Sequence, residues 1–466
     1  MDEKKLTYQQ WIDSFPENFP YYNPATTNPN NPLFPIVASG IKYNNGTKEI
    51  PFEELVSAKN CGFTVGMQAS VSNGNEGITK SLENARSANI RVMFSNNAFK
   101  EYGIEGMLPK DEDLKEWFGG IRWSDEPSID EVKTSDSPEG TNLQKGYRAL
   151  QEQNTPYIIY INLKGEIDPI DIKAEENVKY TYEDYVKDFQ KNFKPALFSY
   201  DSYPIYEKIS LLYEGFSFYT PVAQEGKVVF TSDSTNQFYE NLDLFSEKSK
   251  ENNRPFWAYC QSLSYMSLDL QWFRPIALEQ YLRFEAFLAL AYGAQGLVYW
   301  GFAMRPNEPA EAYFSALLNR RNEPTASWYF AKKVNDEIKK YSYIFLNNRP
   351  QETEKSKVYN YPLSNDLFSI KITSLSGQEI VVARFISSLS TYLVIVSTDA
   401  LNYIDIDINL NVRSVSLNPV NELTPITSQG KEGTQLLNGS NLRILPPGGF
   451  RILSFRTRQI IPLKSS

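Results

Sequence analysis

The sequence predicts an α/β protein, a (β/α)8 TIM barrel followed by an all-β antiparallel sandwich. Three observations carry this prediction. From residue 33 onward, eight short apolar runs alternate with longer helical patterns, which is typical of a closed parallel barrel. Near residue 347 the pattern changes to short strand-like runs with no long amphipathic helix between them. The chain of 466 residues is long enough for a barrel and a smaller second domain.

The predicted barrel strands are continuous apolar runs, as expected when both faces of a strand are buried. They are Leu33–Ser39, Thr64–Ser70, Ile90–Ser95, Gly120–Ser124, Tyr157–Leu163, Ala196–Tyr200, Phe256–Gln261 and Gly296–Phe302. The helical patterns are Phe52–Asn60, Glu76–Ala88, Asp111–Phe118, Thr141–Gln153, Tyr182–Phe193, Thr235–Lys250, Ala277–Tyr292 and Thr325–Phe345. A doubly wound sheet is the alternative, but the turn after the first strand lacks the Gly-rich phosphate loop of that fold.

These patterns place the barrel at residues 33–347, behind an irregular N-terminal arm of residues 1–32 that is rich in Asn, Pro and Tyr. A long insertion, residues 206–233, follows the sixth predicted strand. Loops that follow barrel strands lie on the catalytic face, so the insertion is expected either to cap the active site or to decorate its rim.

The C-terminal domain is predicted over residues 348–466, after a polar, Pro-broken segment. Its expected strands are Phe368–Ile372, Glu379–Phe385, Tyr392–Ser397, Tyr403–Ile408, Ser414–Leu417, Arg443–Leu445 and Arg451–Phe455. Short strands with turn residues between them favour an antiparallel sandwich. The domain has no Trp, so we expect it to stabilise the barrel rather than bind glycan.

Composition excludes several classes of function. The chain has no histidine, so Ser-His-Asp and Cys-His catalysis are excluded, and acid–base chemistry falls to Asp, Glu, Tyr or Lys. Only Cys61 and Cys260 are present, too few for a common zinc site, and both are predicted to be buried thiols. The net charge is -9 without a cluster of cations, which argues against nucleic acid as a partner.

No cofactor or metal is expected, and the oligomeric state stays open. No apolar stretch is long enough for a transmembrane helix, and no signal peptide is visible. We expect an exported protein (periplasmic, cell-surface or secreted) whose leader is missing from this sequence, with a cytoplasmic location as the alternative. Aromatic residues make up 14% of the chain, which suits stacking against sugar rings but equally a Tyr-rich core.

The sharpest motif is Trp123-Ser124-Asp125-Glu126-Pro127, which comes at the end of the fourth predicted strand. Residues at the carboxyl ends of barrel strands line the active site. A Glu that is partly desolvated beside a Trp has a raised pKa, which suits a general acid. The structural alternative is a helix start, because Asp and Glu cap helices and Pro occupies their first turn.

The motif resembles the large clan of (β/α)8-barrel glycoside hydrolases that includes the β-galactosidases and cellulases. In that clan the acid/base Glu ends the fourth strand in an Asn-Glu-Pro or Asp-Glu-Pro setting, which matches Asp125 to Pro127. A subgroup with Trp-Asp-Glu-Pro-like, Asn-Leu and Asp-x-Tyr-Pro segments matches at Trp123, at Asn162-Leu163 and at Asp201-Ser202-Tyr203-Pro204. The resemblance covers residues 30–460 and implies an O-glycosidase with Glu126 as its acid.

Other residues at predicted strand ends are candidates for contacting a sugar. Asp201 and Tyr203 follow the sixth strand, and Asn162 ends the fifth. Gln68 lies at the end of the second, and Trp300 ends the eighth, where the resemblance implies an aromatic floor for the sugar that is cleaved. Asp125, Trp123 and Gln261, which ends the seventh strand, belong to the same candidate set. Each also has a structural interpretation, as a turn residue or a core residue.

The seventh strand departs from the clan. The clan's nucleophile is a Glu at its end, whereas this chain has Gln261, and no Asp or Glu lies between Arg254 and Leu268. An inverting reaction, which needs no protein nucleophile, is one mechanism compatible with Gln261. In it Glu126 is the acid and Asp201 the base. This requires the two carboxyl groups to lie ~6.5–9.5 Å apart. Asp269, on the following loop, is a less favoured partner.

The sequence therefore predicts a glycoside hydrolase that acts on an oligo- or polysaccharide through paired carboxyl groups. The alternative is a catalytically degenerate barrel that only binds glycan, and Gln261 is its best support. A lyase or esterase is disfavoured because such enzymes often need His or metal ligands. The separation of the Glu126 and Asp201 carboxyl groups discriminates between the first two hypotheses.

Overall fold

The computed structural model describes residues 33–41, 49–68, 74–95, 106, 108–133, 140–152, 157–165, 180–205, 207–208, 232–267, 272–304, 311–346, 348–361, 368–387, 390–412, 420–424, 433–437 and 439–456. The N-terminal arm, most of the 206–233 insertion, Asp269 and the expected strand Ser414–Leu417 lie outside these residues. Contacts divide the chain into two compact units, one of residues up to Glu279 with Gln295–Lys339, the other of Gln280–Ala294 with Lys340–Ser466.

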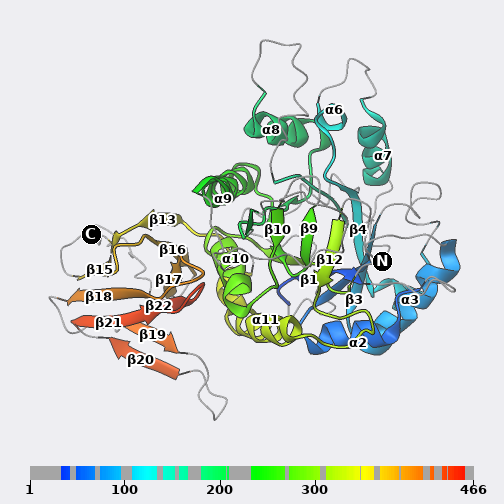
Figure 1. The fold of residues 1–466 in the computed structure, drawn as a ribbon. Coiled ribbons are helices and arrows are strands. Elements are labelled where there is room, and N and C mark those ends of the chain that lie inside the picture. The colour runs from blue at the N-terminus through cyan, green and yellow to red at the C-terminus, as the bar shows by residue number, and fades with distance from the viewer. Residues whose placement is uncertain are drawn as a thin grey trace, which may run out of the picture. The chain divides into compact units, whose positions relative to one another are not determined.

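The first unit contains an eight-stranded parallel sheet that closes into a barrel (Figure 1). Its strands are β1 (Ile36–Ile41), β2 (Val65–Gln68), β3 (Arg91–Ser95), β4 (Phe118–Asp125), β5 (Ile158–Asn162), β6 (Phe198–Tyr200), β8 (Phe256–Gln261) and β11 (Gly296–Trp300). The sheet order is β5-β4-β3-β2-β1-β11-β8-β6, and a parallel bridge between Leu163 and Tyr200 joins its two ends. All eight predicted strands are thus confirmed, and so is the TIM barrel.

Helices alternate with these strands, as the sequence predicts. They are α2 (Phe52–Asn60), α3 (Gly74–Ala88), α5 (Glu112–Lys115), α6 (Ile129–Val132), α7 (Asn142–Gln151), α8 (Tyr182–Phe193), α9 (Ser232–Asn252), α10 (Glu279–Ala291) and α11 (Ala326–Phe345). Capping boxes start α6, α7 and α8, with Ser128, Thr141 and Thr181 at the N-caps. The short helix α6 was not predicted; it directly follows the Asp-Glu-Pro turn and contacts α7 and α8 (Figure 1).

The barrel interior is filled by side chains rather than open. Val37, Met67, Tyr160, Trp257 and Tyr259 belong to one buried cluster contributed by several strands. Both cysteines are buried free thiols, as predicted. Within the described residues, no helix is long and apolar enough to span a bilayer.

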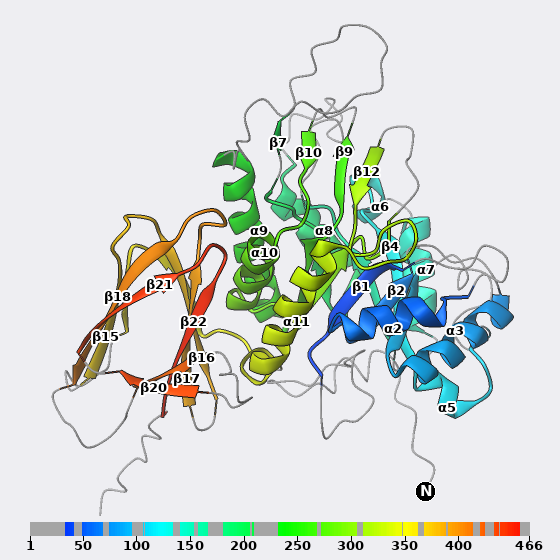
Figure 2. The ribbon, with the colours of Figure 1, turned by 60° about the horizontal axis from the view of Figure 1, so that its bottom comes forward.

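A small antiparallel sheet, which the sequence analysis missed, is built from segments that follow the barrel strands (Figure 2). Its order is β12 (Glu311–Ser315), β9 (Ser264–Ser267), β10 (Trp272–Arg274) and β7 (Glu207–Lys208). Because these segments come after β6, β8 and β11, the sheet lies on the catalytic side of the barrel and adds a wall beside the strand ends.

The second unit contains an antiparallel β-sandwich, again as predicted. One sheet has the order β13 (Glu352–Ser356), β16 (Ile380–Ile386), β17 (Ser390–Ser397), β22 (Phe450–Arg456), β19 (Val420–Thr424) and β20 (Gly433–Leu437). The other has the order β14 (Val358–Tyr361), β15 (Phe368–Ser374), β18 (Ile404–Val412) and β21 (Ser440–Leu445). The strands β13, β14, β19 and β20 were not predicted, because their residues are more polar than those of the central strands.

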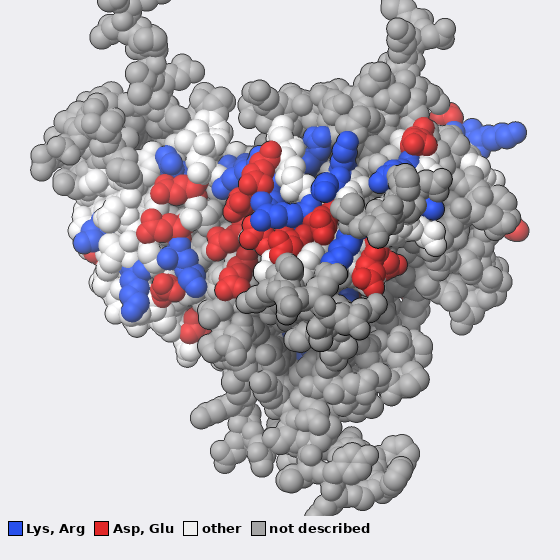
Figure 3. Space-filling view, turned by 90° about the horizontal axis from the view of Figure 1, so that it is seen from above, with Lys and Arg blue, Asp and Glu red and all other residues white. Residues whose placement is uncertain are grey.

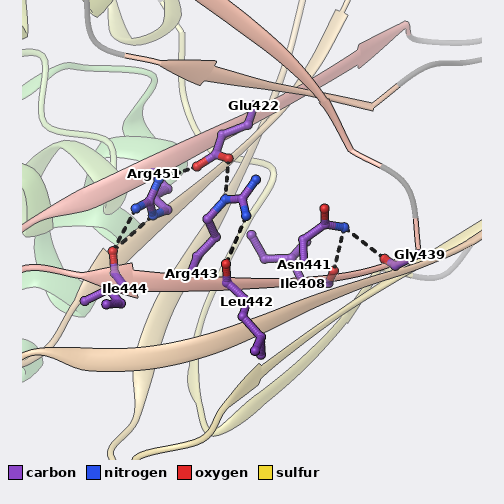
Figure 4. Close-up of polar contacts among 8 residues, drawn as sticks. All are labelled: Ile408, Glu422, Gly439, Asn441, Leu442, Arg443, Ile444 and Arg451. Carbon is purple, nitrogen blue, oxygen red and sulfur yellow. Dashed lines mark hydrogen bonds and ion pairs between the residues drawn. The ribbon is translucent and has the colours of Figure 1, made fainter.

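A buried carboxylate links the two sheets of the sandwich (Figure 4). Glu422, on β19, is 1% exposed at its side chain and accepts a hydrogen bond from Arg443 Nε on β21 at 2.7 Å. Arg451 Nη1, on β22, donates to the other carboxylate oxygen. Two guanidinium groups thus compensate one buried charge, as burial of a carboxylate requires.

Candidate active site

Glu126 stands at the carboxyl end of the barrel, one residue beyond the last residue of β4. Its φ is +48°, a left-handed conformation that residues other than Gly seldom adopt. The backbone N–H of Glu126 donates to the carbonyl oxygen of Asn162 at 2.8 Å, which fixes this turn against the end of β5. Unfavourable backbone geometry held by neighbouring structure is frequent at functional sites.

Asp201 follows β6, and its N–H donates to the Leu163 carbonyl at 3.3 Å. Its carboxyl group shares a hydrogen bond with the carboxyl group of Glu126. Two carboxyl groups make such a bond when one of them carries a proton, because like charges at this distance repel. The structure therefore brings the two predicted catalytic residues into one carboxyl pair.

The surroundings of the pair favour retention of that proton. The pKa of Glu126 is raised because the surrounding protein displaces water, although the residue still reaches solvent; the Asp201 hydrogen bond opposes this effect, and the Asp125 charge adds to it. The pKa of Asp201 lies well above its usual range, first because of burial and then because of the charges of Glu126 and Asp125. The pair titrates as a unit.

An inverting pair needs ~6.5–9.5 Å between its carboxyl groups to hold a water molecule. Glu126 and Asp201 act on each other directly, and each changes the pKa of the other. The physical reason is that β5, which lies between β4 and β6, contacts both flanking turns through the adjacent carbonyls of Asn162 and Leu163.

Asp125 lies at the centre of a polar network next to the pair. Its Oδ2 atom is 2.8 Å from Arg122 Nη1, and its Oδ1 accepts from Asn162 Nδ2 at 3.1 Å. The Oδ1 of Asn162 in turn accepts from Ser199 Oγ at 3.0 Å. Asn162 is fully buried, and both ends of its amide serve the network. Asn162 therefore positions Asp125.

Arg122 carries the network into the barrel interior. Its guanidinium is buried beside Tyr259, whose hydroxyl lies 3.2 Å from that of Tyr160. Although burial acts to lower the pKa of Arg122, the charge of Asp125 outweighs this and the pKa is raised. Arg122 thus remains a cation beneath the carboxyl groups, where it compensates the charge of Asp125.

Aromatic rings form one wall of the site. Tyr203 stacks on Trp300 with ring centroids 5.8 Å apart and an interplanar angle of 25°. Tyr265, on β9, meets Trp300 edge-on at 5.0 Å. The guanidinium of Arg274, on β10, lies 5.1 Å from the centroid of the Tyr203 ring. The small antiparallel sheet therefore holds Trp300, which is partly exposed, in a fixed orientation.

Several buried polar atoms at the strand ends have no hydrogen-bond partner within the structure described. They are Asp201 Oδ1, Tyr203 Oη, Gln68 Nε2 and Ser39 Oγ, which come from the ends of β6, β2 and β1. Buried polar groups in proteins nearly always have partners, so each group without one needs an explanation.

Two residues expected to bind substrate make contacts within the protein. Trp123 is 4% exposed, donates from Nε1 to the Leu143 carbonyl at 3.4 Å and packs against Gly146 of α7, so it faces away from the barrel mouth. Gln261 uses its Nε2 atom to hold the carbonyls of Leu263 and Pro275, at 3.3 and 3.2 Å. The desolvation of Glu126 therefore does not come from Trp123.

Other residues of the site were missed. Arg122 could have been found, because a lone charged residue inside a buried strand indicates a functional or paired group. Tyr265 and Arg274 could not, because they lie in segments that were predicted to be loops. The charge of Lys164 lowers the pKa of Glu126. Lys164 follows the predicted fifth strand, but no motif around it indicates a role in the site. No group of three or more Asp, Glu or Cys in the described part of the chain is arranged to hold a metal ion.

A pocket of about 450 Å³ lies beside the aromatic wall. Met304, Tyr313 and Ala316 line it and also belong to the apolar cluster against which Trp300 packs. Its rim is polar and includes Arg320, Arg321 and Glu323.

Acidic and basic side chains are interspersed on the described part of the face seen from above (Figure 3), without an extended area of one sign.

Comparisons with known proteins agree with this architecture. Residues 175–341 match the family model of glycoside hydrolase family 42, described as beta-galactosidase. The match spans less than half of the chain and includes Asp201, Gln261 and Trp300, but not Glu126. No curated protein matches the sequence.

Solved structures show the same fold. A catalytic mutant of a family 42 beta-galactosidase from G. stearothermophilus superposes with a TM-score of 0.50 at 9% identity, covering 91% of this chain and 98% of that chain. The matched segment, taken with the barrel and the C-terminal sandwich, supports a glycosidase, whose substrate is a carbohydrate.

Proposed function

We propose that this glycosidase cleaves O-glycosidic bonds of an oligo- or polysaccharide with Glu126 as the general acid. The observation that carries the proposal is the carboxyl pair at the mouth of the barrel, where Glu126 reaches solvent and is hydrogen-bonded to Asp201. A carboxyl group with a raised pKa can keep its proton long enough to deliver it to the oxygen of a departing sugar.

The groups around Glu126 suit that task. Asp125, fixed by Arg122 and Asn162, places a negative charge beside the position at which positive charge develops on the sugar ring. Trp300 offers a ring face on which a sugar can stack. Substituents of the sugar can bind to three buried polar atoms at the strand ends. Asp201 Oδ1 accepts hydrogen bonds, and Tyr203 Oη and Gln68 Nε2 can donate them.

Asp201 as the base of an inverting reaction is the finer form of this hypothesis. It requires substrate binding to separate the two carboxyl groups to ~6.5–9.5 Å, and the direct hydrogen bond between them does not support this. The first-formed anomer of the released sugar, followed by proton NMR before mutarotation, tests it. Inversion supports Asp201 as the base, and retention excludes that role.

A barrel that only binds glycan is the second candidate. Gln261 favours it, because the position of the clan's nucleophile holds an amide that is bonded to backbone carbonyls. The carboxyl pair favours catalysis, since pure recognition of sugar hydroxyls does not need two acids that share a proton.

The deciding experiment compares the wild-type protein with Glu126→Gln on a panel of oligosaccharides, galactosides included because of the family match. The wild type is expected to release sugar, and Glu126→Gln to be at least about 10²-fold slower. Glu116→Gln is the matched control, since it makes the same chemical change just before β4, at the opposite end of the strand. Equal activity of Glu126→Gln and wild type, or no release by the wild type, would contradict the proposal.

A further inference from the structure

Helix α8 contacts two of the turns at the carboxyl end of the barrel. Tyr182 and Tyr185 lie on one face of α8, three residues apart, and their rings stack with centroids 6.0 Å apart at an angle of 25°. α8 also contacts α6, the short helix that directly follows the Asp-Glu-Pro turn (Figure 1). The hydroxyl of each tyrosine is bonded to backbone groups close to Glu126.

The hydroxyl of Tyr185 joins the turn after β4 to the turn after β5. It donates to the carbonyl oxygen of Pro127 at 2.7 Å. Burial raises the pKa of this phenol, a hydrogen bond from the backbone of Lys164 opposes the rise, and the charge of Glu126 adds to it. A neutral phenol donates one hydrogen bond and accepts others, so this single side chain holds both turns.

The Pro127 carbonyl is not used by the helix that follows it. The first carbonyl that α6 uses belongs to Ser128, its N-cap, which accepts from the N–H of Val132 at 3.2 Å. Pro127 precedes this cap and is buried, so its carbonyl is left to accept from Tyr185. A buried carbonyl that loses its donor is costly, and the bond therefore restrains the turn strongly.

Glu126 depends on such restraints. Its φ of +48° is unfavourable for a residue with a side chain, and such a conformation persists where the surrounding structure holds it. On one side the N–H of Glu126 donates to the Asn162 carbonyl at 2.8 Å, and on the other the next residue is held by Tyr185. Loss of either bond allows the turn to relax and the carboxyl group of Glu126 to move.

Tyr182 holds the second of the two turns. Its hydroxyl donates to the carbonyl oxygen of Lys164. The next residue, Gly165, lies against Asp201, because a Cβ atom added to it would lie 2.0 Å from the Asp201 carbonyl oxygen. One face of α8 thus restrains both the turn that carries Glu126 and the turn that contacts Asp201.

We propose that Tyr185 is a positioning residue for catalysis, which fixes the carboxyl group of Glu126 relative to Asp201 by joining Pro127 to Lys164, and that Tyr182 supports it through the same second turn. The proposal rests on the proposed function, because Glu126 is the acid in both. It does not depend on which carboxyl group carries the shared proton, or on whether the reaction inverts or retains configuration.

The first test compares Tyr185→Phe with Tyr147→Phe. Tyr147, on α7, is likewise fully buried, and its hydroxyl donates to the Ile159 carbonyl at 3.2 Å, within β5 and away from the Glu126 turn. Each variant loses one buried hydrogen bond, so the melting temperatures should fall by comparable amounts. Only Tyr185→Phe should lower kcat, by about 10-fold or more, with KM little changed.

The outcomes of this comparison separate the positioning role from the proposed function. Equal kcat in Tyr185→Phe and Tyr147→Phe, with hydrolysis that still depends on Glu126, would overturn the positioning role alone. Hydrolysis that does not depend on Glu126 would overturn the proposed function and, with it, the positioning role.

The second test needs no substrate. Amide hydrogen exchange followed by mass spectrometry reports how firmly a backbone segment is held. Exchange at the Glu126 amide and in residues 128–133 should be faster in Tyr185→Phe than in the wild type, and should be unchanged there in Tyr147→Phe. Unchanged exchange of this segment in Tyr185→Phe would contradict the restraint, even if kcat falls.

The third test uses Tyr182→Phe, which should fold even if Tyr185→Phe does not, because Tyr182 is only half-buried. Its kcat should fall by about threefold, since it loosens only the second turn. The double variant should lose less activity than the product of the two single losses, because both hydroxyl groups hold the same turn. A wild-type kcat in Tyr182→Phe, or independent losses in the double variant, would refute the shared role.

Discussion

Asp201 is hydrogen-bonded to Glu126, so that a carboxyl group following β6 and one following β4 meet across the end of β5. The pairing depends on the closed barrel, in which the end of β5 contacts both neighbouring turns. Burial raises the pKa of Glu126 and the bond to Asp201 opposes that rise, so the site is a proton-sharing pair rather than two independent carboxylates.

The pH dependence of the wild-type enzyme follows from this pair. Burial raises the pKa of both members, so the shared proton is lost at a higher pH than from an ordinary carboxyl group, which titrates near about 4.3. Activity should therefore persist above that range and decline as the pH rises through the upper pKa of the pair. A profile of kcat/KM against pH measures this, and an alkaline limb at the ordinary carboxyl value would contradict it.

Removal of the buried Arg122 cation should shift the alkaline limb of the pH profile of kcat/KM to higher pH. Arg122 lowers the pKa of Glu126 and compensates Asp125, so Arg122→Met raises the pKa of Glu126 through both effects. The alkaline limb is expected to move to higher pH while the maximal rate falls. Asp201→Asn, which abolishes the shared proton, should move the limb to lower pH. Shifts of the same sign in the two variants would show that the pair does not titrate as a unit.

Gly165 controls the position of Asp201. A Cβ atom at residue 165 would lie 2.0 Å from the Asp201 carbonyl oxygen, so Gly165→Ala must displace the end of β6. A displacement of about 1 Å at a catalytic group can cost about 10²-fold in rate, and a loss of that order in kcat/KM is expected. Gly377→Ala, where the new methyl group meets nothing within 4 Å, is the control. Full activity of Gly165→Ala would show that the position of Asp201 is not critical.

The two tryptophans on either side of the barrel wall should behave differently when replaced. Trp123→Phe loses packing against α7 and should lower the free energy of unfolding by about 1–3 kcal/mol with little change in kcat/KM. Trp300→Ala removes the exposed platform and should lower kcat/KM by about tenfold or more with a smaller effect on stability. Thermal melts and kinetics on the same preparations measure both, and the reverse pattern would contradict the assignment.

The ion pairs of the sandwich offer a test of its stability. Glu422→Gln leaves Arg443 and Arg451 without their buried partner and should destabilise the domain by about 2 kcal/mol, discounted from the usual cost because both guanidinium groups reach solvent. Glu352→Gln is the matched control, since its bond to Arg384 is largely exposed and is worth less than about 1 kcal/mol. Urea midpoints of the sandwich transition compare the two, and equal shifts would refute a special role for Glu422.

The sequence by itself determined the order of elements and the place of the acid. Continuous apolar runs predict buried parallel strands, and all eight were found, because burial on both faces leaves little choice of residue type. Glu126 was placed at the mouth for the same reason, since a residue just after a barrel strand lies on the catalytic face. The polar strands β13, β14, β19 and β20 were missed because their pattern does not differ from that of loops.

Only the tertiary structure decided which side chains face the site. The register shift between Arg122 and Ser124 in β4 is not visible in the sequence, and in the folded strand Arg122 lies inside the barrel while Trp123 packs outward on α7. The contact between Glu126 and Asp201 joins residues that are far apart in the chain, through a strand that pairs with both neighbours. Local sequence patterns specify strands and their ends, whereas the burial of Glu126 and its contact with Asp201 exist only once the barrel has closed.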